Sequence, residues 1–101
     1  MDEPNKLQHH LLRAARLSSE TNRNLVQFCF TDLEFALSMA QVASASTEPE
    51  IRQRMLSMGR HAAALVLSRL PTLSLTADER QQMRDELQAV RERLQENGVE
   101  L

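Results

Sequence analysis

The sequence predicts an all-α protein: a small antiparallel three-helix bundle with up-down topology and an additional N-terminal helical segment. The apolar residues are mainly Leu and Ala, and Gly (2) and Pro (3) are rare, which is typical of helices. Residues 25–45 are apolar around most of a helical circumference, and two later stretches begin with helix-capping motifs. A chain of 101 residues is expected to form one domain. We divide it into an N-terminal helical segment (1–24), a core bundle (25–97) and a tail (98–101).

The N-terminal segment has two interpretations. Leu7, Leu11 and Ala14 share one helical phase, and no Gly or Pro occurs between Asn5 and Glu48. These residues could therefore form one helix of about 42 residues, roughly 63 Å long. Polar residues, however, occupy the apolar stripe at 18–24. This favours a break there, leaving a short first helix that folds back or pairs.

Residues 25–45 are predicted to form the central helix, and they contain all three phenylalanines. A helix this apolar needs at least two neighbours to cover it. Phe35 is expected to be buried, so Phe35→Ala would cost about 3–5 kcal/mol. Cys29 has no second cysteine to pair with, and we interpret it as a small buried hydrophobic residue.

A second helix is predicted over about 47–70. Thr47 and Glu50 fit a capping box with Pro49 in the first turn, and Pro71 is expected to end the helix by biasing Leu70 away from helical angles. Gly59 lowers helix propensity, so it is expected to have a packing role near the level of Phe35. The residues predicted to form the buried stripe are Ile51, Met55, Met58, Ala62, Leu65 and Val66.

A third helix is predicted over about 76–97. Thr76 and Glu79 again fit a capping box, and Gly98 suits a left-handed turn at the C-terminal end. The apolar residues of this helix form one narrow seam of Met83, Leu87, Val90 and Leu94. We therefore expect it to lie in the groove of the other two helices with most of its surface in water.

One polar site is predicted. Asp32 interrupts the apolar face of the central helix, and a buried carboxylate needs a partner. Arg60 and His61 lie near its level on the next helix, so Asp32, Arg60 and His61 form the candidate buried polar site. A structural ion pair and a functional site both remain open. The sequence shows no paired acids, glycine-rich loop or metal-ligand spacing, so we expect no enzyme activity, cofactor or metal.

The predicted function is protein–protein interaction. A net charge of −2 gives no electrostatic footprint for nucleic acid, and no segment is apolar enough to span a membrane. We expect a non-catalytic cytoplasmic module that associates with another protein or forms a homodimer through Leu7, Leu11 and Leu12. The alternative is a small helical regulator that binds a ligand near Asp32 or nucleic acid through a basic surface. That surface consists of Arg13, Arg16 and Arg23.

Overall fold

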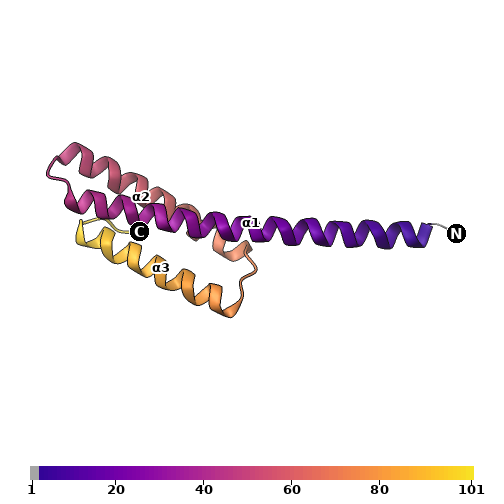
Figure 1. The fold of residues 1–101 in the computed structure, drawn as a ribbon. Helices are drawn as coiled ribbons and strands as arrows, with labels where there is room; N and C mark the ends of the chain where they lie inside the picture. Colours follow the sequence, from indigo (N-terminus) through magenta and orange to yellow (C-terminus); the bar gives the residue numbers. More distant parts are fainter. Residues whose placement is uncertain (1–2) are drawn as a thin grey trace.

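A computed structural model describes residues 3–101, with side chains from Lys6 onward. This part of the chain forms three α-helices and no strand. The elements are α1 (Glu3–Ala45), α2 (Pro49–Arg69), the 3-10 turn η1 (Leu70–Thr72) and α3 (Ala77–Glu96). The chain reverses direction at each connection, so neighbours in sequence run antiparallel (Figure 1). The predicted all-α class and the three-helix bundle are confirmed.

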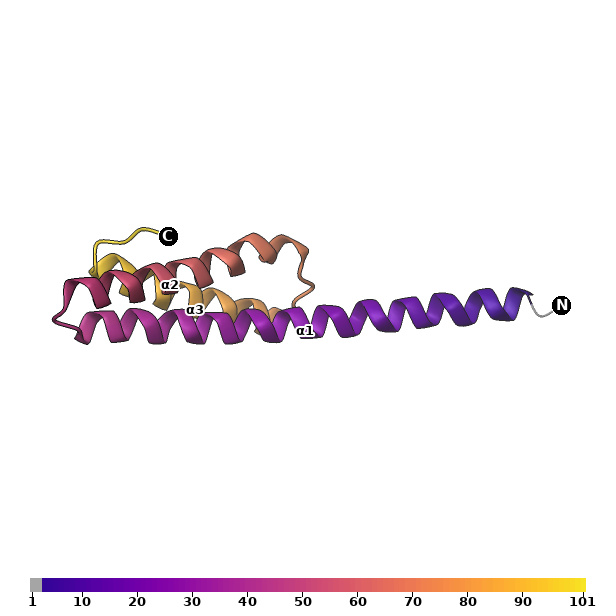
Figure 2. The same ribbon diagram turned by 90° about the horizontal axis from the view of Figure 1, so that it is seen from above.

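Helix α1 is continuous over 43 residues, and the predicted break at 18–24 is wrong. Ser, Thr and Asn each cost only a few tenths of a kcal/mol in a helix relative to good helix formers. Without Gly or Pro, this cost does not end the helix. About half of α1 projects beyond the bundle, giving a molecule of 72 × 25 × 16 Å (Figure 2). The boundary that we drew between residues 24 and 25 therefore lies inside one helix.

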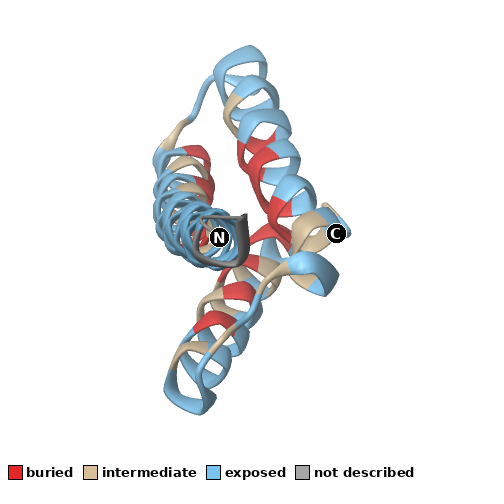
Figure 3. Ribbon diagram, turned by 90° about the vertical axis from the view of Figure 1, so that its right-hand side faces the viewer, coloured by how far each residue is buried: buried red, intermediate tan, exposed pale blue. Residues whose placement is uncertain are grey.

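Helix α1 is central, because α2 and α3 both pack on it and make few contacts with each other. Seen along α1, α2 and α3 diverge, and the buried residues lie on the sides that face α1 (Figure 3). The predicted seam of α3 is confirmed, since all four of its residues are buried. From α1 and α2, the buried side chains are Val26, Cys29, Leu33, Ala36, Ala40, Ala43, Leu56, Ala62, Ala63 and Val66.

The contact between α1 and α2 is close because small residues lie on both helices. A Cβ atom added to Gly59 would lie 3.0 Å from the carbonyl oxygen of Ala36 and 3.4 Å from the Cβ of Met39. Gly59 thus has the packing role that the sequence predicts. It packs against the backbone of α1 at Ala36, however, and not against the ring of Phe35.

The ends of α3 have the capping interactions that the sequence predicts. The Thr76 hydroxyl accepts from the Glu79 N–H at 3.1 Å, and the Glu79 carboxylate accepts from the Thr76 N–H at 3.0 Å, which completes the capping box. Gly98 has a φ of 78°, in the left-handed region. The tail then turns back over the bundle, where Val99 packs on the core and Arg60 donates from Nε to the Glu100 carbonyl at 2.9 Å.

The ends of α2 differ from the sequence prediction. The N-cap residue is Glu48, and no side chain caps the helix there. The Ser46 hydroxyl accepts from the Glu48 N–H at 3.3 Å, so Ser46 and not Thr47 stabilises this turn. At the other end, Leu70 keeps α-helical angles (φ −47°, ψ −45°), and the chain continues through Pro71 as η1. Pro71 therefore tightens the helix end without moving Leu70 out of the helical region.

The phenylalanines are not the centre of the core. Phe28 is 62% exposed and Phe35 is 40% exposed, and only Phe30 packs against the buried cluster. The prediction that Phe35 is buried is wrong because α2 and α3 cover only one side of α1. The expected cost of Phe35→Ala falls accordingly below the value for a buried ring.

Candidate interaction surface

The N-terminal part of α1 stands away from the rest of the molecule. We call residues 3–21 the arm. Every arm side chain that the structure describes, from Lys6 onward, is exposed. The bundle begins at Asn22, whose amide exchanges two hydrogen bonds with the backbone of Ser74. Next to it, Arg23 Nη1 lies 2.9 Å from Glu79 Oε2. These contacts fix where the arm leaves the bundle.

The three predicted interaction residues all lie on the arm, but they do not share a face. Leu7, Leu11 and Leu12 are 62%, 61% and 68% exposed. Successive residues of an α-helix are rotated by about 100°, so residues four apart share a face and adjacent residues do not. Leu7 and Leu11 therefore belong together, and Leu12 lies on another side of the arm.

A row of residues that includes Leu7 and Leu11 runs the length of α1 and, on a straight helix, drifts around the helix by about 20° per heptad. Residues at alternating steps of four and three follow it, which is the spacing of a coiled-coil seam. We call this row the α1 seam. It consists of Leu7, Leu11, Ala14, Ser18, Thr21, Leu25, Phe28, Asp32, Phe35, Met39 and Val42. Within it, Phe28, Phe35 and Val42 are exposed although they lie beside the bundle.

Helix α2 presents a matching row. Ile51, Met58 and Leu65 repeat every seven residues and are 38–41% exposed. The contact between Gly59 and Ala36 sets the register of the two antiparallel helices. It places each of the three within about 3 Å, along the helix axis, of one exposed residue of α1. We call these six residues the hairpin face; its pairs are Ile51 with Val42, Met58 with Phe35, and Leu65 with Phe28.

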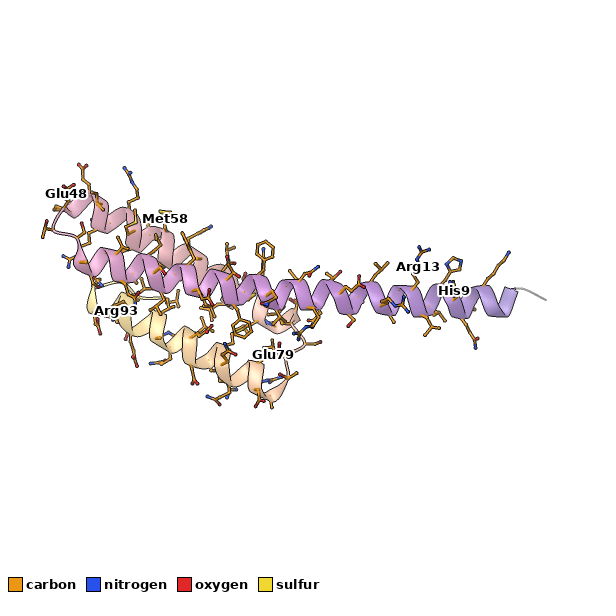
Figure 4. All side chains as sticks on the ribbon, in the orientation of Figure 1. His9, Arg13, Glu48, Met58, Glu79 and Arg93 are labelled. Atoms are coloured by element: carbon orange, nitrogen blue, oxygen red, sulfur yellow. The ribbon has the colours of Figure 1, made fainter. Side chains whose placement is uncertain are left out.

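The hairpin face points away from α3. On α1, the opposite flank carries Phe30, which lines a surface hollow with Glu79 and Gln82 of α3. On α2, the opposite flank carries Arg60, which binds the tail. Met58 projects from the edge of α2 that is remote from α3 (Figure 4). No element of the described chain covers this face, so it is an open apolar surface on the outside of the α1–α2 hairpin.

The predicted polar site does not assemble. Asp32 is half-buried, and its carboxylate has no ion pair within the part of the chain that the structure describes. Arg60 is exposed and bonded to the tail, and His61 is exposed. The prediction of a buried carboxylate is therefore wrong. Asp32 lies at the edge of the core, on the α1 seam, and is only half-buried.

Cys29 is fully buried, and burial raises the pKa of its thiol above the ordinary value, with the charge of Asp32 acting in the same direction and that of Arg69 against it. A thiol in this setting is a poor nucleophile. The position of Cys29 agrees with its predicted role as a packed hydrophobic residue.

The predicted basic surface is divided. Arg23 is paired with Glu79, whereas Arg13 and Arg16 lie on the arm. His9 and Arg13 project from the same side of α1 (Figure 4). With Leu12 and Arg16, they line a shallow hollow that is open to solvent. The arm therefore has an apolar face, formed by Leu7 and Leu11, and a basic face.

A further hollow, which the sequence does not predict, lies between η1 and the first half of α3. It has a volume of about 420 Å³ and is open on one side. Its walls are mostly apolar, with two guanidinium groups at Arg80 and Arg84. The apolar residues that line it are Leu70, Pro71, Leu73, Leu75, Met83 and Leu87.

Comparison of the chain with known protein families, with curated proteins and with solved structures finds no match. Only the geometry of the candidate surface therefore indicates its role. Within residues 3–101, no helix combines the length and the apolar character that crossing a membrane requires.

The sequence prediction missed the hairpin face. Its signal was the seven-residue spacing of residues 28, 35 and 42 and of residues 51, 58 and 65. Because these residues are apolar, the sequence pattern predicts them to lie in the core. Only the positions of α2 and α3 around α1 show that they are left outside.

Proposed function

We propose that this protein is a non-catalytic self-association module that forms a homodimer. The observation that carries the proposal is the exposed apolar surface of α1 and α2, formed by the hairpin face together with Leu7 and Leu11. Contiguous apolar surface of several hundred Å² on a small protein usually marks a binding site for a partner. Symmetric pairs are the most common assemblies, which favours a second copy as that partner.

The size of this surface suits a stable dimer. Eight large apolar side chains are each about 40–60% exposed. Together they expose on the order of 800 Å², so complete burial of all eight would supply the area per copy of a standard interface. Burying this surface would stabilise the pair through the hydrophobic effect. The polar candidates Asp32, Arg60 and His61 do not converge, which supports a role in binding over one in catalysis.

The single thiol supports a reducing compartment. Cys29 is free and buried in the core, where it cannot reach a partner cysteine without unfolding. Proteins that function without disulfides are typical of the cytoplasm. We therefore propose that the module functions in the cytoplasm.

Sedimentation equilibrium over a range of micromolar concentrations tests the proposal. We expect the mass to approach twice the monomer value of 11.5 kDa as the concentration rises. Phe28→Gln combined with Met58→Gln should shift the transition to higher concentration, because both side chains leave the interface. A mass that stays at the monomer value throughout the range would reject self-association.

The same protein tests the alternative of a nucleic-acid-binding regulator. Arg13 and Arg16 lie together on the arm, but the net charge of the chain is −2. We expect no binding to mixed-sequence duplex DNA at low salt. Binding that weakens steeply with added salt would instead favour the regulator, because it indicates the release of counterions from phosphates.

A further inference from the structure

We infer that the arm of each copy lies antiparallel on the hairpin face of a second copy, with the two-fold axis near Asn24 and Leu25. This arrangement rests on the proposed self-association and adds the orientation and register of the pair. The arm then becomes the fourth helix of the partner's bundle, in contact with both α1 and α2 of the partner.

The lengths of the two parts of α1 agree with this arrangement. The helix spans Glu3–Ala45, so its midpoint is Asn24, at the point where it leaves the bundle. At 1.5 Å per residue, residues 3–24 are about 33 Å long and residues 25–45 about 32 Å. Two antiparallel α1 helices centred on residue 24 therefore overlap over their full length. Each arm then covers one hairpin face.

The sizes of the seam residues are complementary in this register. A residue of one copy and the residue of the second copy that lies at the same level along the helix axis have numbers that sum to 49 or 50. The small residues Ala14 and Thr21 then lie at the levels of Phe35 and Phe28 of the second copy. Small side chains opposite large ones allow two helices to approach and pack closely. Leu7 likewise lies at the level of Val42, so apolar contacts continue to the end of the hairpin.

The polar residues of the seam select the same register. Ser18 lies at the level of Asp32 of the second copy, so these two polar residues of the seam meet. A shift of one heptad in either direction places Asp32 at the level of Leu11 or Leu25 instead. Burying a carboxylate against leucine is unfavourable. The half-buried Asp32, which has no ion pair within the described chain, thus serves to set the register.

Other ways of pairing the arms leave the hairpin face open. The two arms could instead pair with each other, either in parallel or antiparallel with the two-fold axis near residue 14. In both cases the hairpin face would remain in water. The antiparallel arrangement about residue 24 covers the arm and the hairpin face together. It is also closed, because each copy offers the same two surfaces and both are used.

Cross-linking with a short bismaleimide tests the orientation in the full-length protein. We expect efficient intermolecular cross-linking when Ala14→Cys and Phe35→Cys are combined. Ala14→Cys alone should give no more cross-linked dimer than the wild-type chain, whose only thiol is the buried Cys29. In the proposed pair, two copies of residue 14 are about 30 Å apart. Cross-linking through Ala14→Cys alone would overturn the arrangement.

Two adjacent leucines provide a matched pair for the interface. Leu11 lies on the α1 seam and Leu12 does not, although both are about equally exposed. Lysine is a good helix former, so neither substitution should break the arm. Leu11→Lys should raise the dimer dissociation constant about tenfold or more, because a buried leucine is lost, and Leu12→Lys should change it less than about threefold. Circular dichroism would check that the helix content is retained.

The outcomes separate the two proposals. A chain that stays monomeric in sedimentation rejects both self-association and the arm arrangement. A dimer that cross-links through Ala14→Cys alone, or that responds equally to Leu11→Lys and Leu12→Lys, keeps self-association and rejects the arrangement. A dimer with the expected cross-links and the expected difference between the leucines supports both.

Discussion

Substituting Gly59 by alanine tests the close approach of α1 and α2. In an exposed helix, Gly→Ala stabilises by about 0.8–1 kcal/mol through helix propensity. At Gly59, the new Cβ would lie 3.0 Å from the Ala36 carbonyl oxygen and 3.4 Å from the Met39 Cβ. Both atoms are fixed to the backbone of α1. Relief therefore requires the two helices to move apart by a few tenths of an ångström, which loosens the contacts along their shared face.

Overpacking of this kind costs about 1–3 kcal/mol. Set against the gain in propensity, Gly59→Ala should lower the free energy of unfolding by about 1 kcal/mol. Gly59→Val adds two further carbon atoms at the same contact and should cost about 3 kcal/mol. The measurement is urea denaturation followed by far-UV circular dichroism. All variants are compared at one protein concentration, because the stability of an associating protein depends on concentration.

Ala64 provides the matched control, because it is exposed on the same helix. Ala64→Gly should cost about 1 kcal/mol, which measures the propensity term alone. If Gly59→Ala were to stabilise the protein by the amount that Ala64→Gly destabilises it, no contact would oppose the added methyl group. The close approach at Ala36 would then be refuted.

Two further predictions concern the core and the start of α3. Leu33→Ala should cost about 3–4 kcal/mol because Leu33 is 1% exposed, whereas Phe28→Ala should cost less than about 1 kcal/mol in the monomer despite the larger ring. Denaturation of dilute protein checks this order, and the reverse order would place Phe28 in the core. The hydrogen bond from the Thr76 backbone, followed by the contact with Arg23, lowers the pKa of Glu79 below its ordinary value of 4.5. The stability from this carboxylate is therefore present above that value and lost as the pH falls through the lowered folded-state pKa. The wild type should exceed Glu79→Gln in stability at neutral pH, and the difference should disappear in acid; a difference that grows in acid would contradict the direction of this shift.

The course of α1 shows how local and tertiary information differ. The absence of Gly and Pro over residues 5–48 allowed one helix, and the structure has one helix. The polar residues at 18–24 favour a break in the sequence prediction because they interrupt an apolar stripe. An apolar stripe indicates which side of a helix packs against other parts of the protein. It does not indicate whether the residues are helical. Polar residues in the stripe therefore mark the part of α1 without a neighbour in the same chain.

Helix capping was predictable where the side chains decide it. Thr76 and Glu79 bond to each other's backbone across one turn, so their spacing alone predicts the start of α3. Thr47 has the same spacing to Glu50, but the chain enters α2 from a three-residue connection. The path of that connection places the Ser46 hydroxyl, and not that of Thr47, next to a free backbone N–H. Which side chain caps a helix after a tight connection depends on the backbone path of that connection. The spacing of capping residues in the sequence does not predict this path.

The sequence by itself determined the helices of this protein and the α3 seam, because helix propensity, caps and seven-residue spacing act between residues close in the chain. Tertiary structure alone decided which side of α1 is buried. Two neighbours that diverge cover only part of a helix that is apolar around most of its circumference. Phe28 and Phe35 remain outside, since the area that each helix covers depends on the angle at which it packs.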